Sequence, residues 1–220
     1  MSHSPTRSIF PNPRNAPRDA PLAMGGRLNV PVLREAYRSG IFPWFSPGQP
    51  ILWWCPDPRF VLRPEDTRVN RSLAKEARKS YWRITFNEAF GEVIRGCAET
   101  ARPDQDGTWI TDDMISAYEQ LHETGLAHSV ECWRDGELAG GCYGVAMGAA
   151  FFGESMFFRQ PNASKVAFVH LTRRLTERGY QLIDCQQRTE HLARFGATLW
   201  PRTQFLDELA NAVKAPVSFA

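Results

Sequence analysis

The sequence predicts an α/β fold of the α+β kind, in which helices flank a mixed sheet and a small N-terminal domain comes first. Two observations support this prediction. Strand-like and helix-like segments follow one another in mixed order from residue 81 onward, and a helix near residues 162–178 joins two apolar strands, which would then be parallel. We therefore expect a flexible arm over residues 1–20, a small N-terminal domain over 21–80 and a larger domain over 81–220.

The composition is that of an ordinary globular protein. Hydrophobic residues make up 43% and charged residues 23% of the chain of 220 residues, which argues against disorder. The net charge of +2 is too small to indicate a nucleic-acid partner by itself. The five cysteines form no CxxC pair, so neither a disulfide framework nor a zinc site is expected, and free thiols fit the cytoplasm. No apolar run approaches the ~18 residues that span a bilayer, so we expect no membrane association.

The chain begins with a proline-rich arm and a short helix. Prolines recur through residues 1–20, so we expect this arm to be mobile or to lie along the surface. Asn29 is a suitable N-cap for a helix over Pro31–Ser39, and Gly40 would end it.

Residues 40–59 combine prolines with aromatic rings. Prolines forbid a long helix, so the rings would be held on rigid, irregular backbone. Such a segment either packs a small subdomain or presents flat faces to nucleobases, and both interpretations stay open. Trp44 is the better candidate for stacking, whereas Trp53 and Trp54 are better candidates for the core.

A basic stripe follows at helical spacing. Residues 70–80 have a helical pattern, and four basic side chains at i, i+4, i+7 and i+8 would share one face. A stripe of this kind is often only a solvated surface, but beside candidate stacking residues it also fits a track for phosphate groups. The four residues are Arg71, Lys75, Arg78 and Lys79.

The larger domain is expected to contain strands and helices in mixed order. Thr111 is a capping signal for a helix, and Asp135–Gly136 would close a hairpin. The expected elements are a strand at Tyr81–Phe86, helices at about Glu88–Glu99 and Thr111–Glu123 with a polar loop at 101–107 between them, strands at 128–134, 138–145 and 149–152, and, after the helix near 162–178, a strand at 181–183, a short helix near 189–195 and a strand and helix through 205–213.

Two carboxylates interrupt the apolar strands of the segment 149–186. The pattern predicts a polar turn at Gly153–Ser155, which holds Glu154, and a strand at Gln181–Ile183, which runs into Asp184. Each acid would stand at the end of an apolar strand, where a buried carboxylate needs a partner. That partner is either internal, as is common for strand-end acids, or a substrate.

Six motifs occur in one order between about residues 20 and 205, and several contain the rare residue Trp. They are Tyr37–Phe45, Trp53–Arg59, Gly107–Thr111, Gly153–Phe157, Asn162–Lys165 and Leu182–Gln186. Together they resemble the motifs of the leucyl/phenylalanyl-tRNA–protein transferases, and six motifs in one order are far more specific than any short pattern alone.

The resemblance implies transfer of Leu or Phe, and less readily Met, from aminoacyl-tRNA to the α-amino group of an N-terminal Arg or Lys of a protein. The reaction would be direct aminolysis of the ester, and the product would be marked for degradation by the bacterial N-degron pathway. The partners implied are Leu-tRNA, Phe-tRNA and the acceptor proteins. The resemblance further implies a GNAT acyltransferase-like catalytic domain, no cofactor and a monomer.

Two alternatives stay open. One is a GNAT enzyme that uses acyl-CoA, although residues 158–162, which precede the crossover helix, lack the glycine-rich loop that would bind a pyrophosphate. The other is an RNA-binding module without chemistry. Tight binding of CoA would favour the first, and binding of tRNA without transfer would favour the second.

The resemblance also implies roles for individual residues. Asp184 and Gln186 correspond to the catalytic pair, and Glu154 to the residue that binds the basic side chain of the acceptor. Alternate residues of a strand share a face, so the two catalytic side chains would converge on the attacking amine while Cys185 points away and only packs. The other implied residues are Tyr37, Trp44, Trp109 and Tyr118 for the 3′-terminal adenosine and neighbouring parts of the donor, Cys142, Phe151, Met156, Phe168 and Leu171 for the donor side chain, and Arg71, Lys75, Arg78 and Lys79 for tRNA.

Three further observations qualify these roles. Cys142 stands where the related enzymes usually have a larger Met, so the selection among donor side chains is not fixed by the resemblance. Lys165 lies in the first turn of the helix near 162–178, against the preference of the helix dipole; it would either pair with Glu154 or meet an anion. The histidines show no ligand spacing with a carboxylate or thiol, so no metal is expected.

Overall fold

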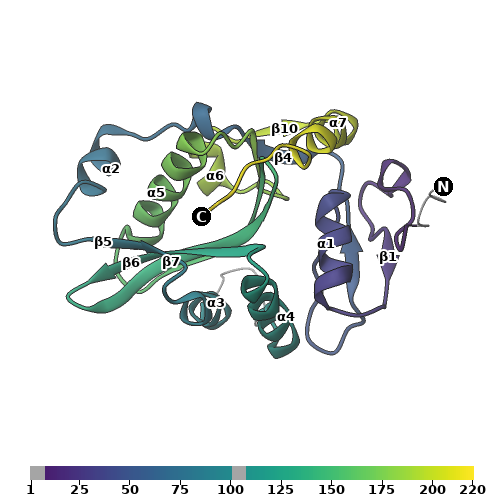
Figure 1. The fold of residues 1–220 in the computed structure, drawn as a ribbon, viewed down its shortest axis with the longest axis horizontal. Helices are drawn as coiled ribbons and strands as arrows, with labels where there is room; N and C mark the ends of the chain where they lie inside the picture. The colour runs from purple at the N-terminus through teal and green to yellow at the C-terminus, as the bar shows by residue number, and fades with distance from the viewer. Residues whose placement is uncertain (1–7, 101–107) are drawn as a thin grey trace.

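A seven-stranded mixed sheet forms the centre of the protein (Figure 1). The computed structural model describes residues 8–100 and 108–220. The strand order is β10-β4-β9-β8-β7-β6-β5, and among these described strands only β8 and β9 are parallel neighbours, which confirms the predicted mixed sheet. The bounds are β4 Arg59–Leu62, β5 Arg83–Phe86, β6 Ala127–Arg134, β7 Glu137–Met147, β8 Ala150–Phe158, β9 Leu182–Asp184 and β10 Thr198–Trp200.

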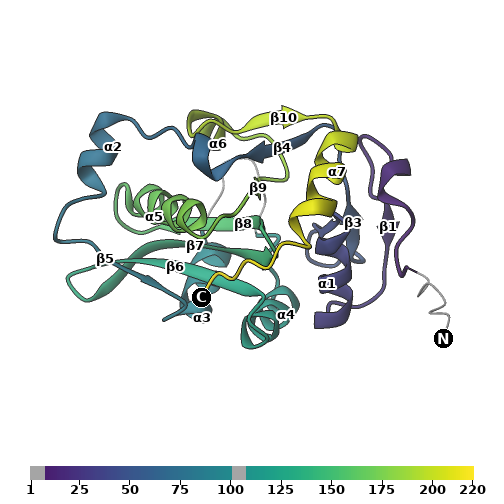
Figure 2. The same cartoon turned by 45° about the horizontal axis from the view of Figure 1, so that its top comes forward.

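Helices cover both faces of this sheet. Helix α5, Ala163–Glu177, crosses from β8 to β9 on one face, and α3, Phe90–Glu99, and α4, Asp112–Glu123, pack on the other (Figure 2). As predicted, the Thr111 hydroxyl accepts a hydrogen bond from the backbone N–H of Met114 and caps α4. The apolar sides of the helices therefore enclose one core on each face of the sheet. The expected polar loop at 101–107 lies outside the described residues.

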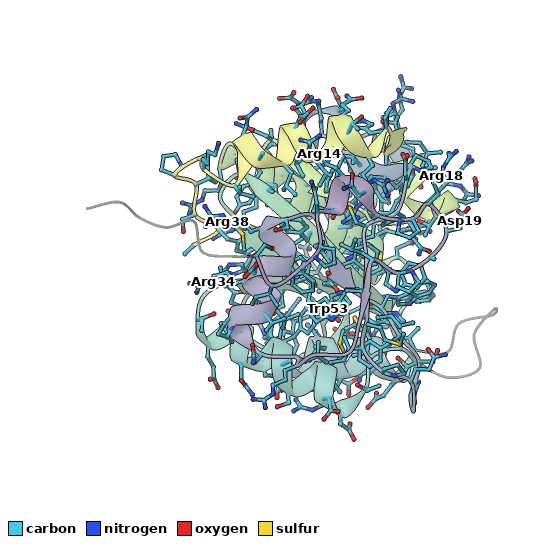
Figure 3. The ribbon with its side chains drawn as sticks, turned by 90° about the vertical axis from the view of Figure 1, so that its right-hand side faces the viewer. Arg14, Arg18, Asp19, Arg34, Arg38 and Trp53 are labelled. Carbon is cyan, nitrogen blue, oxygen red and sulfur yellow. The ribbon has the colours of Figure 1, made fainter. Side chains whose placement is uncertain are left out.

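The N-terminal segment forms a small unit at one end of the molecule, on the right in Figure 1 and facing the viewer in Figure 3. Helix α1, Val30–Arg38, is capped by the side chain of Asn29, as predicted. A three-stranded sheet lies beside it, and its central strand carries Trp53, which is 2% exposed and confirms the expected core position. The strands are β1 Ala23–Met24, β2 Phe42–Pro43 and β3 Leu52–Trp54, and a 3-10 turn spans Pro13–Asn15.

The described part of the N-terminal arm lies along the surface, which is one of the two expected arrangements. Ser8 donates a hydrogen bond to Glu35, Phe10 packs its ring against Trp53 with the ring centroids 4.9 Å apart, and Arg14 pairs with Asp207. Residues 1–7 lie outside the described part of the chain. The arm thus connects α1 to the C-terminal helix α7, Arg202–Ala212.

Strand β4 belongs to the large sheet, although the sequence analysis assigned residues 21–80 to the small domain. Val61 of β4 pairs with Asp184 of β9, and β10 pairs on its other side. The segment Arg59–Leu62 is apolar after its first residue and fully buried, so it stabilises the protein more as an inner strand than as part of a small separate unit. The expected boundary at residue 80 therefore leaves one strand of the large sheet, β4, on the N-terminal side.

The predicted basic helix is shorter than expected. Helix α2 spans Arg71–Glu76 and ends before Arg78 and Lys79, so the expectation that all four basic residues share one helix face is wrong. The reason lies in tertiary structure: the ring of His170, on α5, makes a 3.2 Å hydrogen bond with the carbonyl oxygen of Ala77 and thereby takes a group that a longer helix would use. A second short 3-10 turn, Pro64–Asp66, precedes α2.

Strand β8 runs unbroken through the position of the predicted turn at Gly153–Ser155. Opposite it in β7, Tyr143 pairs with Ser155 and Gly144 with Gly153, so Glu154 is the extra residue of a β-bulge. Gly144 makes this close approach possible, because a Cβ atom there would lie 2.2 Å from the carbonyl oxygen of Phe152. The polar turn was therefore a wrong prediction, since a bulge places the acid inside the strand.

The remaining helices lie toward the C-terminus. Helix α6, Glu190–Arg194, and helix α7 match the expected short helix and final helix. Gly40, at a φ of +74°, packs against α7, where a Cβ atom would lie 2.7 Å from Leu206. Within the described ranges, none of the helices has the length and the apolar character needed to cross a lipid bilayer.

Candidate active site

A pocket of about 490 Å³ lies between the bulged strand β8, helix α5 and the N-terminal unit. Nine of the predicted site residues line it: Trp44, Trp109, Cys142, Phe151, Glu154, Met156, Phe168, Leu171 and Gln186. Tyr37, Tyr118 and Asp184 lie behind its wall, and the four predicted tRNA contacts lie outside it. The structure thus brings most of the predicted residues together in one cavity.

One part of the pocket is apolar. Cys142 on β7 pairs in register with Met156 on β8, and Phe151 lies further along the same strand. Phe168 and Leu171, three residues apart on α5, close the opposite side. The five residues come from three packed elements, so the shape of this part of the pocket is fixed by the core rather than by a loop.

Aromatic rings lie at another part of the pocket wall. Trp44 is half-buried and contacts Trp54, with the ring centroids 5.7 Å apart, while the indole of Trp54 donates a hydrogen bond to the carbonyl oxygen of Trp44. Trp109 is largely buried. Phe158 is 59% exposed and also lines the pocket, although sequence reasoning assigned it no role.

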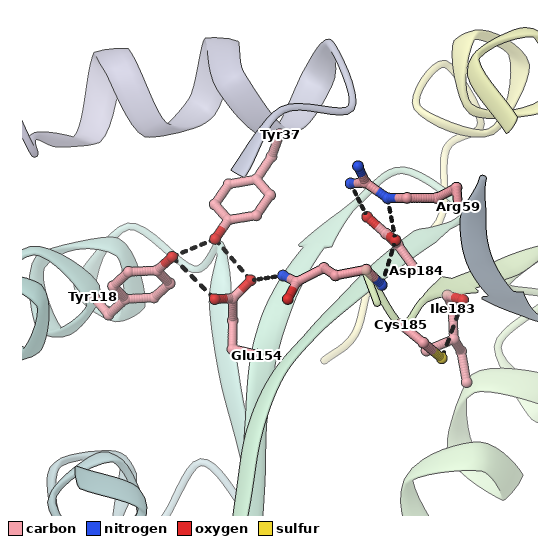
Figure 4. Close-up of polar contacts among 8 residues, drawn as sticks. Tyr37, Arg59, Tyr118, Glu154, Ile183, Asp184 and Cys185 are labelled. Carbon is pink, nitrogen blue, oxygen red and sulfur yellow. Dashed lines mark hydrogen bonds and ion pairs between the residues drawn. The ribbon is translucent and has the colours of Figure 1, made fainter. Parts of the chain in front are cut away.

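Glu154 is held by three neutral donors, as Figure 4 shows for the two tyrosines. Its Oε1 accepts hydrogen bonds from the Tyr37 hydroxyl at 2.8 Å and from Nε2 of Gln186 at 2.8 Å. Its Oε2 accepts one from the Tyr118 hydroxyl at 3.2 Å. The tyrosines come from α1 and α4, so the carboxylate joins the N-terminal unit to a helix on one face of the sheet. The side chain forms no ion pair within the described part of the chain.

The oxygen atoms around Glu154 favour an additional proton. The two tyrosine hydroxyls also contact each other, which makes three oxygen–oxygen contacts. The hydroxyls supply only two protons to these contacts, so one contact lacks a proton unless the carboxyl group carries one. Burial raises the pKa of Glu154 to about 7; hydrogen bonds from the two tyrosines and from Gln186 lower it, and the charge of Asp184 raises it. Burial, and then the charge of Glu154, raise the pKa of both Tyr37 and Tyr118 well above 10. The carboxyl group therefore titrates near neutral pH, while the phenols stay protonated.

Asp184 has an internal partner that sequence reasoning missed. Arg59 donates from Nε to Oδ1 at 2.7 Å and from Nη2 to Oδ2 at 2.6 Å, and both side chains are 0% exposed (Figure 4). The guanidinium is sandwiched between the rings of Phe42 and Phe205, 4.7 Å and 4.6 Å from their centroids. Its Nη1 has no hydrogen-bond partner among the described residues. The Asp184 charge is thus neutralised inside the protein.

The predicted convergence of Asp184 and Gln186 from one strand face is wrong in its geometry. Strand β9 ends at Asp184, and Gln186 has a left-handed backbone with a φ of +61°. Its backbone N–H donates to Oδ1 of Asp184 at 2.9 Å, which fixes the turn and directs the Gln186 amide to Glu154. Asp184 therefore reaches the pocket only through Gln186, and its catalytic assignment stays a prediction.

Cys185 lines the pocket instead of pointing away from it. Burial raises the pKa of its thiol, and the charge of Asp184 raises it further. A thiol that stays protonated is a poor nucleophile, which agrees with the expectation that Cys185 only packs. No group of His, Cys, Asp and Glu suited to a metal ion occurs among residues 8–100 and 108–220.

Sequence reasoning assigned no role to several residues of the site. Arg59 lies in one of the six motifs but was assigned no role. Its position directly before an apolar strand was the signal that could have identified it as the partner of a strand-end acid. Thr189, His191 and Leu192 line the pocket from the loop and helix after β9. Lys165 also lines the pocket but forms no ion pair with Glu154, so one of its two expected interactions is absent from the described structure.

Comparisons with known proteins agree on one family. Residues 61–210 match the family described as leucyl/phenylalanyl-tRNA protein transferase, and residues 26–57 match its N-terminal domain. A leucyl/phenylalanyl-tRNA–protein transferase of Myxococcus xanthus is 55% identical over 208 residues, which cover 94% of this chain and 89% of the relative. One from Chromohalobacter salexigens is 57% identical over 214 residues, which cover 96% of this chain and 83% of the relative.

Among solved structures, a GCN5-related N-acetyltransferase from Kribbella flavida is 13% identical, with a TM-score of 0.39 over 77% of this chain and 59% of its own. A GCN5-related N-acetyltransferase-like protein from Streptococcus suis is also 13% identical, with a TM-score of 0.39 over 77% of this chain and 63% of its own. Neither similarity bears on function.

Proposed function

Because the chain belongs to the leucyl/phenylalanyl-tRNA protein transferase family, we propose that it transfers Leu or Phe, and less readily Met, from aminoacyl-tRNA to the N-terminal Arg or Lys of a protein. It is an aminoacyltransferase by its family. The product carries a new N-terminal residue, which marks the protein for the N-degron pathway. One observation supports this function most directly: a buried carboxylate, which forms no ion pair within residues 8–100 and 108–220, lies beside an apolar pocket.

The apolar part of the pocket suits the donor side chain. Leu, Phe and Met are unbranched at Cβ and fit a cavity bounded by flat and flexible apolar side chains, whereas β-branched residues are stiff near the backbone. A pocket of this kind discriminates by only about 1–3 kcal/mol per methylene-sized difference, so the three donors overlap. We assign Trp44 and Trp109 to contacts with the terminal adenosine, and the position of both residues on the wall of the same cavity supports this assignment.

Glu154 is the proposed binding site for the basic side chain of the acceptor. A carboxylate held by neutral donors keeps its negative charge available, and a guanidinium or ammonium group that enters the pocket forms a charge-assisted hydrogen bond with it. Binding of the cation favours the ionised carboxylate, so the acceptor lowers the pKa of Glu154 when it binds.

The chemistry is aminolysis of an ester. The neutral α-amine attacks the ester carbonyl, the bond from the carbonyl carbon to the ribose oxygen breaks, and the amine proton ends on that oxygen. An α-amine has a pKa of about 7.7–8.0, so a useful fraction is neutral at pH 7 and positioning supplies much of the rate gain. Gln186 orients the amine. We assign Asp184 a positioning role, since its hydrogen bond with the Gln186 backbone holds that side chain toward Glu154.

The decisive experiment is transfer of radiolabelled Leu from Leu-tRNA to three peptides that differ only in their first residue, Arg, Lys or Ala. Transfer to the first two and not to the third is the expected result. Transfer that is independent of the first residue contradicts the acceptor assignment, and no transfer to any peptide contradicts the proposed function. A parallel incubation with acetyl-CoA distinguishes the acyl-CoA alternative.

A further inference from the structure

A second pocket, of about 510 Å³, opens next to the candidate active site and shares two lining residues with it, Lys165 and His191. It lies between the segment that leads into α2, the first turn of α5, and α6, which Figures 1 and 2 show gathered in one part of the molecule. Because the two pockets share these side chains, they are adjacent, and an extended ligand can contact both. The other lining residues are Arg68, Val69, Asn70, Leu73, Arg194 and Phe195.

Three positively charged side chains line the second pocket. Arg68, Lys165 and Arg194 are exposed, and none of them forms an ion pair with any residue in the described ranges. None of the lining residues that the structure describes is an Asp or Glu. Three cations around one cavity repel one another, and a bound anion removes that repulsion. The cavity therefore favours a ligand with negative charge.

Two neighbouring groups add to this preference. Lys165 lies in the first turn of α5, where the free backbone N–H groups and the helix dipole also attract anions. The Nε2 atom of His191 has no hydrogen-bond partner in the described structure. Burial lowers the pKa of His191, and the charges of Lys165 and Arg194 lower it further, so both cations lie close to this ring.

We infer that the second pocket binds the phosphodiester groups immediately 5′ of the esterified nucleotide of the donor RNA. This inference rests on the proposed function, because it requires a polynucleotide whose end enters the first pocket. Phosphate is the anion that repeats along such a chain, and three separate cations suit successive phosphates better than a single carboxylate. The pocket also borders α2, which begins with Arg71, so the chain can continue toward the predicted tRNA contacts.

The test compares two donors that differ in phosphate. Leu-tRNA carries the phosphodiester chain, whereas leucyl-adenosine is an ester of the same amino acid with no phosphate. In the double variant R68Q/R194Q, we expect the KM for Leu-tRNA to rise about tenfold or more, while kcat/KM for leucyl-adenosine changes less than twofold. The affinity for uncharged tRNA is also measured at several salt concentrations. In the double variant, the slope of log affinity against log salt concentration should become shallower by about 1.4, because each of the two lost contacts with a single-strand phosphate contributes ~0.7.

A charge-matched control removes two cations at the other end of the molecule. Arg34 and Arg38 are exposed on α1, far from α2 in the view of Figure 1 and labelled in Figure 3. The variant R34Q/R38Q loses the same net charge, so equal effects of the two double variants overturn the assignment to the second pocket. Equal losses with both donors also overturn it, because they indicate damage to the first pocket.

Failure of the inference and failure of the proposed function give different results. If the native protein transfers Leu from neither donor, the proposed function fails, and the salt dependence of tRNA binding still decides whether the second pocket binds phosphate. If the native protein transfers Leu from both donors and R68Q/R194Q is unchanged with both, only the inference fails.

Discussion

Two carboxylates, one on the pocket wall and one behind it, differ in what surrounds them. Asp184 is paired in bidentate fashion with Arg59, and both side chains are fully buried. Glu154, at 9% exposure, accepts hydrogen bonds from two tyrosines and one glutamine, all neutral, and faces the cavity. The first charge is already neutralised, while the second is not.

This difference separates a structural task from a binding task. A buried ion pair holds backbone and side chains in place, but its charge is not available to a ligand. A carboxylate solvated by neutral donors stays available to a cation and has a pKa that depends on whether the cation is present. One acidic residue, Asp184, therefore stabilises the structure, whereas the other, Glu154, is available to bind a cation. The following predictions test that contrast.

The largest effect is expected from removal of Arg59. Arg59→Gln leaves the buried charge of Asp184 without a partner, and we expect a loss of about 3–5 kcal/mol in the free energy of unfolding. Urea denaturation measures it. Arg63→Gln is the matched control: Arg63 pairs with Glu208 at 3.1 Å on the surface, with 33% and 39% of the two side chains exposed, and should cost less than about 1 kcal/mol. Similar losses in the two variants would contradict an essential internal pair.

The next effect concerns stability and pH. The pKa of Glu154 is about 7 in the folded protein and 4.5 for the carboxyl group in the unfolded chain. Between these two pH values the folded protein therefore holds a proton that the unfolded chain releases. The stability of the native protein relative to Glu154→Gln should therefore be highest below pH 4.5, fall as the pH rises through 7 and stay constant above that value. The expected change is about 3 kcal/mol.

Urea denaturation of both proteins at several pH values measures this difference. Burial lowers the pKa of His128 to about 4, which destabilises the native protein as the pH falls, but His128 is present in both proteins and cancels in the comparison. A difference that does not change with pH would show that Glu154 titrates normally.

A smaller effect is expected on acceptor binding. For a peptide that begins with Arg, Glu154→Gln should lower kcat/KM about 10- to 100-fold and leave the KM for Leu-tRNA unchanged, because one charge-assisted interaction is lost. Below pH 7, log kcat/KM plotted against pH should rise with a slope near 2 in the native protein, because both Glu154 and the α-amine must lose a proton. In the variant only the α-amine titrates, so the slope should be near 1. A peptide that begins with citrulline, which has no charge, serves as the control and should not distinguish the two proteins.

The smallest effects are expected from the tyrosines. Tyr37→Phe and Tyr118→Phe each remove one donor from Glu154, so the pKa of Glu154 should rise further and the pH profile of transfer should move upward. Tyr37 makes the shorter hydrogen bond with Glu154, 2.8 Å against 3.2 Å, so its replacement should cause the larger shift in the pKa of Glu154. Loss of the longer hydrogen bond of Tyr118 should cost about 1 kcal/mol or less. Equal shifts, or a shift downward, would contradict the role of the two hydroxyls as donors to the carboxylate.

Much of the fold follows from local signals in the sequence. Asn29 and Thr111 cap the helices that their positions predicted, and the mixed order of strands and helices predicted the mixed sheet. The apolar residues Phe168 and Leu171 share a helix face because of their spacing, and both line the pocket. Signals of this kind act within a few residues, so they can be recognised without knowledge of the partner elements.

The sequence by itself determined the family, the order of the elements and most of the residues that meet in the pocket. The tertiary structure decided which acid pairs with an arginine and which accepts hydrogen bonds from neutral donors: Arg59 meets Asp184 across 125 positions of the chain, and a bulge turns an expected loop residue, Glu154, into a buried member of a strand. The physical reason is that the state of a buried charge depends on every group packed around it, and strand pairing between distant segments brings those groups together.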